Sequence, residues 1–250
     1  MKRFVLATAV FSLSGLSLVV AAQTATKPAV LVELFTSEGC SSCPPADNLL
    51  AALDRDKGYR GIPVVVLSEH VDYWDHEGWR DPFSSPDWTQ RQNNYNERFH
   101  LQSVYTPQMV IDGTQQVNGS DGPAIAHALE KAAVRAQHVS IEIKDATWSG
   151  DTLQATVSIP ETDEKGADIY AVLADDQDTS DVKRGENAGH TLTNVAVARV
   201  LRKVGKLRRA YNGQIRIPLP SGMERGKMRL IVFAQKGENG EVLGAAEHDI

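Results

Sequence analysis

The 250-residue chain carries 26 basic and 32 acidic residues, a net charge of −6, and 42% of its residues are apolar. This length and apolar content suit a globular protein of one large or two small domains. The acidic balance excludes a bulk attraction to nucleic acid, so no nucleic-acid partner is expected. Only two cysteines are present, three positions apart, which excludes the densely cross-linked scaffold of small secreted domains.

The first 22 residues have the pattern of a secretory signal peptide. Two basic residues precede an uncharged apolar stretch over residues 4–20, and Ala21 and Ala22 suit cleavage directly after them. A membrane anchor is the alternative, but the apolar run is shorter than the ~20 residues of a span and contains Ser, Gly and Thr. We predict a secreted, periplasmic protein without a membrane span after signal removal, with an organelle lumen or full export left open.

The next part of the chain predicts a parallel crossover unit. Residues 29–35 and 62–67 are almost continuously apolar and predict two buried strands. Between them the cysteine pair precedes residues 46–53, whose periodicity predicts a helix. Pro44 and Pro45 fit the first turn of that helix, where their missing N–H groups are not needed. A strand, a CxxC pair, a helix and a strand follow one another in the order that parallel pairing requires.

Further elements divide the chain near residue 137. Helices are predicted over residues 85–100 and 120–137, and a hairpin signal at Asp112-Gly113 lies between them. From residue 138 onward, short alternating strands separated by turn residues predict a second, all-β domain of the sandwich kind.

The Cys40-Ser41-Ser42-Cys43 segment lies where it can perform thiol–disulfide chemistry. At a helix N-terminus, free N–H groups and the positive end of the helix dipole favour a thiolate at the first cysteine. We therefore assign Cys40 as the nucleophile that attacks a partner disulfide and Cys43 as the thiol that resolves the mixed disulfide. A bridge across so short a loop stabilises a fold little, so redox chemistry explains the pair better.

Two alternatives use the same cysteines. One is a structural disulfide in a non-catalytic interaction module. The other is a protein that binds or delivers a soft metal such as copper, with Cys40, Cys43 and His70 as ligands. In the redox interpretation no organic cofactor is expected, because the reactive group is the Cys40–Cys43 disulfide itself.

Two segments resemble thioredoxins. Residues 32–43 are similar to their first strand and active-site loop, with the loop one residue longer, and Tyr105-Thr106-Pro107-Gln-Met-Val-Ile-Asp-Gly resembles their cis-proline loop. The resemblance implies a cis bond before Pro107, beside the disulfide, and a substrate chain paired with Thr106. A trans proline at the start of a strand is the alternative. The Ser-Ser dipeptide and the lack of a tryptophan before Cys40 depart from thioredoxins and leave open whether the protein oxidises, reduces or isomerises.

Longer motifs make the resemblance specific to one family. GCSSCPPAD, HVDYWD, GWRDPFSSP and VYTPQMVIDG are similar to secreted thioredoxin-like proteins of the domain of unknown function 1223 family, over nearly the whole mature chain. The resemblance implies an α/β thioredoxin-like domain over residues 23–137, followed by a smaller all-β sandwich-like domain over residues 138–250. It also implies an extracytoplasmic thiol–disulfide oxidoreductase. Its partners would be protein thiols or disulfides and an unidentified redox partner.

Two acidic residues near the cysteines are candidates for the site. Glu33 lies close to where thioredoxins keep a buried acid, and it could take a proton from Cys43. An outward-facing glutamate on an edge is the alternative. Glu38 is nearer in sequence, and its negative charge would oppose a thiolate at Cys40.

Two further polar segments are candidates. His70 and Asp72 follow the second strand, at the same sheet edge as the cysteine loop, and His70 could stabilise the Cys40 thiolate. A packed loop with Trp74 and Trp79 as anchors is the alternative. In the second domain a glycine-flanked loop can bind a partner or simply turn, and its polar residues are Glu186, Asn187 and His190.

Overall fold

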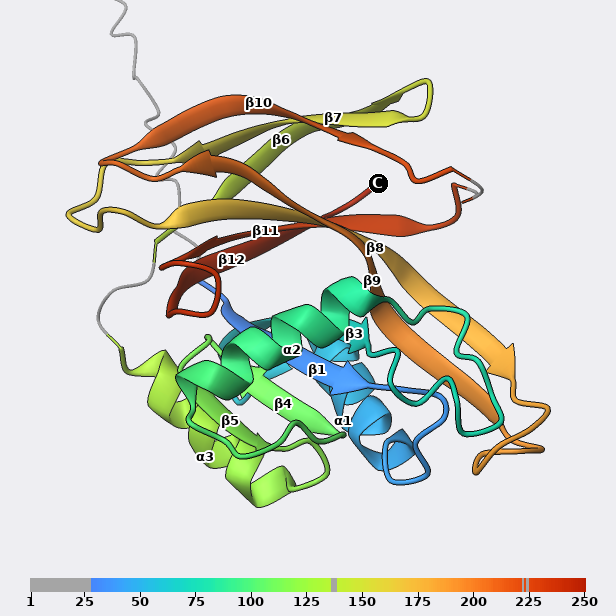
Figure 1. The fold of residues 1–250 in the computed structure, drawn as a ribbon. Coiled ribbons are helices and arrows are strands. Elements are labelled where there is room, and N and C mark those ends of the chain that lie inside the picture. The colour runs from blue at the N-terminus through green and yellow to red at the C-terminus, as the bar shows by residue number, and fades with distance from the viewer. Residues whose placement is uncertain (1–27, 136–138, 222, 224) are drawn as a thin grey trace, which may run out of the picture.

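The computed structural model describes residues 28–135, 139–221, 223 and 225–250 (Figure 1). The predicted signal peptide and the predicted domain boundary at residue 137 lie outside these ranges, so both stay predictions. In the described part of the chain, no helix is long and apolar enough to cross a membrane. The elements of the described residues, in chain order, are β1 (Val30–Thr36), α1 (Pro44–Arg55), β2 (Gly58–Tyr59), β3 (Ile62–His70), α2 (Pro86–Arg98), β4 (Gln108–Ile111), β5 (Gln115–Asn118), α3 (Gly122–Ala133), β6 (Glu142–Ser149), β7 (Thr152–Ile159), β8 (Asp168–Asp181), β9 (Thr191–Lys206), β10 (Tyr211–Pro218), β11 (Met228–Gln235) and β12 (Val242–Asp249).

Most strands belong to one mixed sheet. Its order is β12-β11-β8-β9-β3-β1-β4-β5, with β2 paired to β3. A three-stranded sheet of β10, β7 and β6 lies over β8 and β11 (Figure 1). The facing sides of the two sheets bury a common apolar core, to which β7 contributes Leu153 and Val157 and the larger sheet contributes Leu173 and Val232.

The predicted α/β thioredoxin-like domain with a separate, smaller all-β sandwich-like domain is wrong. The protein is mostly β, and its large mixed sheet combines strands from both halves of the chain. The halves join where β3 pairs with β9, at Ser68 and Val197. Apolar patterning indicates which segments are strands but not which strands pair. Because β9 has 16 residues, it pairs with β8 and still reaches β3.

Two helices cover opposite faces of β1, because neighbouring strand residues point to opposite sides of a sheet. Leu34 lies in the core cluster that contains Leu50 of α1. Its neighbour Phe35 contacts Tyr95 of α2, with ring centroids 6.0 Å apart. The predicted helix starts are confirmed, since Pro44 follows the cysteine pair and side chains cap the other two helices.

A buried ion cluster ties α2 to both halves of the sheet. Arg91 Nε donates to Glu33 Oε1 at 2.6 Å and lies 3.3 Å from Glu69 Oε1. The Tyr95 hydroxyl donates to Glu33 Oε2 at 2.6 Å, and Arg91 Nη2 donates to Gln235 of β11 at 3.2 Å. Burial and the neighbouring Glu33 charge raise the pKa of Glu69 well above its ordinary value. One guanidinium therefore faces two buried carboxyl groups, of which Glu69 is made harder to ionise by burial and by its neighbour.

We predict that Arg91→Met destabilises the fold by about 3–5 kcal/mol, because it leaves the Glu33 carboxylate buried without its cation. Urea unfolding measures the difference. The matched control is Arg98→Met, at an exposed position of the same helix, which should change stability by less than about 0.5 kcal/mol. Equal stabilities of the two variants would contradict the role of this cluster.

Candidate functional site

The two cysteines form a disulfide at the N-terminus of α1. Cys43 directly precedes the helix, and Cys40 lies in the loop that follows β1. Both cysteines are fully buried, whereas Ser41 and Ser42 between them are exposed. Cys40 Sγ lies 3.3 Å from Ser42 Oγ. The predicted disulfide is confirmed, and it lies directly beneath an exposed dipeptide.

The predicted proline loop borders the cysteine loop. The bond between Thr106 and Pro107 is cis, as predicted. Trp74 connects the two loops, because its Nε1 donates to Thr106 Oγ1 at 2.8 Å while its Cβ would lie 3.1 Å from a Cβ added at Gly39. A Cβ added at Gly119 would lie 3.1 Å from Pro107 and 3.0 Å from the first turn of α1. Thr106 and Pro107 therefore lie at the site, and their role toward a substrate stays a prediction.

The connection between β8 and β9, residues 182–190, contacts the cysteine loop from the C-terminal half. Asn187 is buried, and its Nδ2 donates to the carbonyl oxygens of Glu38 at 2.8 Å and Cys40 at 3.0 Å. The exposed Glu186 accepts a hydrogen bond from the Ser41 amide at 3.1 Å. The sequence marked this loop as polar, but it did not indicate that the loop packs on the cysteines.

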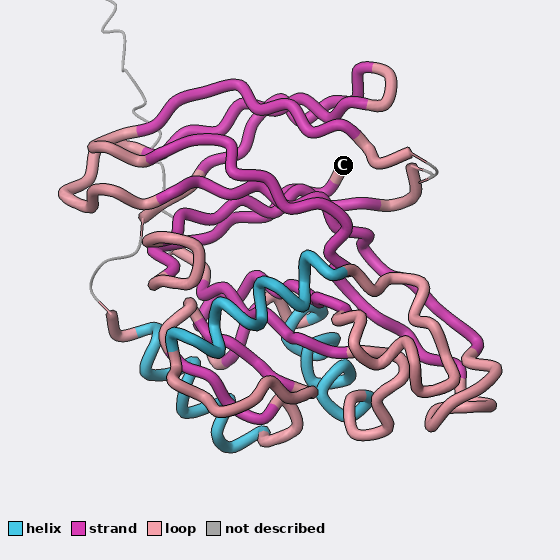
Figure 2. The backbone as a smooth tube through the Cα atoms, viewed as in Figure 1, coloured by secondary structure: helices cyan, strands magenta, loops and turns pink. Residues whose placement is uncertain are grey.

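A glycine lets this connection approach closely. Gly185 has a φ of +77°, which favours glycine, and a Cβ added there would lie 3.1 Å from the Cβ of Trp79. The connection therefore lies between the cysteine loop and the segment that follows β3. Figure 2 shows these loops gathered at one end of the molecule.

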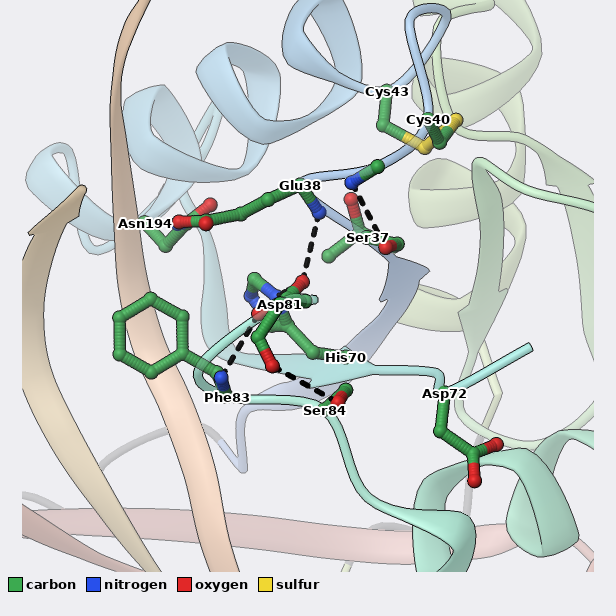
Figure 3. Close-up of polar contacts among 12 residues, drawn as sticks. Ser37, Glu38, Cys40, Cys43, His70, Asp72, Asp81, Phe83, Ser84 and Asn194 are labelled. Atoms are coloured by element: carbon green, nitrogen blue, oxygen red, sulfur yellow. Dashed lines mark hydrogen bonds and ion pairs between the residues drawn. A yellow bond between two sulfur atoms is a disulfide. The ribbon is translucent and has the colours of Figure 1, made fainter. Parts of the chain in front are cut away.

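Buried polar groups lie beneath the cysteine loop (Figure 3). The Asp81 carboxylate accepts hydrogen bonds from the Glu38 amide at 2.8 Å, His70 Nδ1 at 2.7 Å and the Phe83 amide at 2.9 Å. Burial opposes a charged imidazole, but the Asp81 carboxylate outweighs it and raises the pKa of His70. Within the described residues, His70 Nε2 is buried without a hydrogen-bond partner.

Glu38 is turned away from the disulfide. Trp79 Nε1 donates to its Oε2 at 2.9 Å, and Asn194 Nδ2 donates to its Oε1 at 3.3 Å. Burial and the nearby Asp81 charge raise the pKa of Glu38. Both features weaken the repulsion of a Cys40 thiolate that the sequence alone predicts.

Asp47 is a site residue that the sequence analysis missed. It lies four residues after Cys43, and side chains at this spacing share one face of a helix. Thr36 Oγ1 of β1 donates to its Oδ1 at 2.8 Å. Burial raises the pKa of Asp47 to about 7. The spacing after Cys43 was the available signal, but the partner on β1 was not visible in the sequence.

Two predicted residues lie elsewhere. Glu33 is buried, but it binds Arg91 and Tyr95 on the α2 face of the sheet, whereas Cys43 begins the helix on the other face. Asp72 accepts a hydrogen bond from Thr89 of α2 at 2.6 Å, and Figure 3 shows it turned away from the disulfide.

The predicted metal ligands contact other protein groups in the structure. Cys40 and Cys43 are joined to each other, and His70 Nδ1 faces Asp81. Over the ranges that the structure describes, no group of three or more His, Cys, Asp or Glu side chains is placed to hold a metal ion.

Comparison with known proteins identifies the family. The model of the family described as protein of unknown function (DUF1223) matches residues 31–235. The chain belongs to the DUF1223 family. This DUF1223 protein is similar to the crystal structure of protein AGR_C_4864 from Agrobacterium tumefaciens, with a TM-score of 0.70 and 28% identity over 90% of this chain and 95% of that chain. The motif-based prediction of the family is thus confirmed.

A second solved structure shares the fold. HBP35 of Porphyromonas gingivalis matches with a TM-score of 0.64 and 16% identity over 90% of this chain and 76% of that chain. At this identity the likeness shows the fold alone. No curated protein matches the chain.

We predict that Asp47→Asn removes a pH-dependent loss of stability. The pKa of about 7 in the folded state lies above the ordinary value of 3.8, so the folded protein holds the extra proton and stability falls as the pH rises from about 4 to about 7. Relative to wild type, Asp47→Asn should gain about 1 kcal/mol or more at pH 8 and little at pH 4.

Urea unfolding at the two pH values, with the disulfide intact, measures this difference. Asp56→Asn is the control, because Asp56 lies at the end of the same helix with an exposed side chain. An equal gain at both pH values for Asp47→Asn would show that its carboxyl is not protonated in the folded protein.

Proposed function

We propose that the protein is an extracytoplasmic thiol–disulfide oxidoreductase that exchanges disulfides with protein substrates through Cys40 and Cys43. The observation that carries the proposal is the cluster of ionisable side chains beneath this disulfide, which comprises Glu38, Asp47, His70 and Asp81. Such burial costs stability and is common at functional sites. The bridge itself closes too short a loop to stabilise the fold appreciably, so stability explains neither feature.

The reaction moves two electrons without a cofactor. A partner thiolate attacks Cys40 Sγ, the bond between the two sulfurs breaks, and the electron pair leaves on Cys43 Sγ, which takes up a proton. The second thiol of the partner then attacks the mixed disulfide, so the partner leaves oxidised and Cys40 leaves as a thiolate. In these steps the protein oxidises a partner dithiol. The same steps run in reverse when the protein reduces a partner disulfide: the Cys40 thiolate attacks that disulfide, and Cys43 resolves the mixed disulfide.

Neighbouring groups support this chemistry. The positive end of the α1 dipole favours a thiolate at Cys40. Asp47, on the Cys43 face of the helix, is suited to exchange a proton with the resolving thiol because its pKa is raised to about 7. Since Cys40 is fully buried, a partner reaches it only when Ser41, Ser42 or an adjoining loop moves.

One observation favours a second candidate function. Both cysteines have no exposed surface, as expected for a structural disulfide in a non-catalytic interaction module. A structural pair resists reduction by glutathione, whereas an exchange catalyst does not.

We predict that Cys43→Ser forms a stable mixed disulfide with oxidised glutathione through Cys40. Cys40→Ser should react at least about tenfold more slowly, because the helix N-terminus activates the thiol that lies outside the helix. Mass spectrometry measures both adducts, and turnover of a model protein disulfide should be lost in both variants. Full exchange activity in Cys40→Ser, or no exchange by the wild type, would refute the proposed function.

A further inference from the structure

Glu186 places a carboxylate on the dipeptide between the cysteines. Its Oε2 accepts a hydrogen bond from the Ser41 amide, which is bonded directly to the carbonyl carbon of Cys40. Covalent geometry therefore keeps this carboxylate within about 8 Å of Cys40 Sγ. Hydrogen bonds from Ser41 lower the pKa of Glu186, so the carboxylate is charged at neutral pH.

The rest of the β8–β9 connection holds this carboxylate in place. The Asn187 side chain binds the carbonyl oxygens of Glu38 and Cys40, on either side of Gly39. Gly185 packs against Trp79 on the other side of Glu186. An exposed glutamate is thus flanked by two residues with fixed contacts, which restricts where its carboxylate can lie.

We propose that Glu186 shifts the equilibrium between the Cys40–Cys43 dithiol and disulfide toward the disulfide. This inference rests on the exchange function proposed above. Glu186 accepts from the Ser41 amide, so this N–H next to Cys40 is not free to donate to a Cys40 thiolate. Its charge also repels the thiolate. The disulfide carries no charge, so Glu186 disfavours only the reduced pair with Cys40 ionised.

Other charged groups near the cysteine loop are already paired. The Glu38 carboxyl binds Trp79 and Asn194, and the Asp81 carboxylate binds His70. Glu186 differs from them because it is exposed and accepts a hydrogen bond from the amide that directly follows Cys40. Its removal should therefore change the cysteines without opening the buried network.

The test is the equilibrium of the full chain with glutathione, in which the disulfide and two glutathione thiols yield the dithiol and one glutathione disulfide. Glu186→Gln keeps an oxygen that can accept from Ser41 but removes the charge. It should shift the equilibrium about threefold toward the dithiol, equivalent to about 14 mV for a two-electron couple. The pKa of the Cys40 thiol, followed by thiolate absorbance, should fall by about half a unit, and both shifts should shrink in 1 M salt.

Two further variants separate charge from packing. Glu161→Gln removes an equal charge from an exposed position after β7 and should leave the equilibrium unchanged. Asn187→Ala frees the connection and should shift the equilibrium in the same direction as Glu186→Gln, because the carboxylate is no longer held on the loop.

The outcomes distinguish the two proposals. If the wild type equilibrates with glutathione but Glu186→Gln has the same equilibrium and the same Cys40 pKa, the tuning role is wrong and the exchange function stands. A shift that persists unchanged in 1 M salt also overturns the electrostatic role. If the wild-type pair does not equilibrate with glutathione at all, the exchange function fails and the tuning role fails with it.

Discussion

The strand pair β8–β9 is the constraint on which the site depends. Its strands of 14 and 16 residues belong to the layer packed on the three-stranded sheet, yet their connection lies against the cysteine loop. The pairing of Ser68 with Val197 fixes β9 beside β3. Asn194 of β9 then holds the Glu38 carboxyl, and Asn187 holds the Cys40 carbonyl. The C-terminal half is therefore part of the site and not an appendage to it.

Two clusters of buried charge lie on opposite faces of β1 and β3, and they differ in balance. On the α2 face, Arg91 supplies a permanent cation for Glu33 and Glu69. On the α1 face, three carboxyls and one imidazole lie together, so positive charge is scarce. Burial raises the pKa of Asp47 to about 7, and the negative charges of Asp81 and Glu38 contribute to the rise. The cluster on the α2 face, which has a cation, is suited to stabilising the fold. The cluster on the α1 face is suited to exchanging protons next to a disulfide.

Local features of the site could be predicted from the sequence, and contacts between distant segments could not. The cysteine pair before a proline-led helix and the cis bond at Pro107 follow from short motifs. The contact of Asn187 with Cys40 spans 147 residues and depends on how β9 pairs, which no local pattern encodes. Glu33 was assigned to the cysteines by resemblance, but strand alternation places it with Phe35 on the α2 face. Burial gives Asp47 its raised pKa even though the Thr36 hydrogen bond opposes the rise, and this too is a tertiary property.

The reduction potential of the wild-type Cys40–Cys43 pair tests the central claim most directly. Equilibration of the protein with thiol–disulfide buffers, followed by mass-tagging of free thiols, gives this value. An exchange catalyst should have a potential between about −120 and −270 mV, the range of known catalysts of this kind. A potential well below about −300 mV would mark a structural bridge and would contradict the proposed redox function.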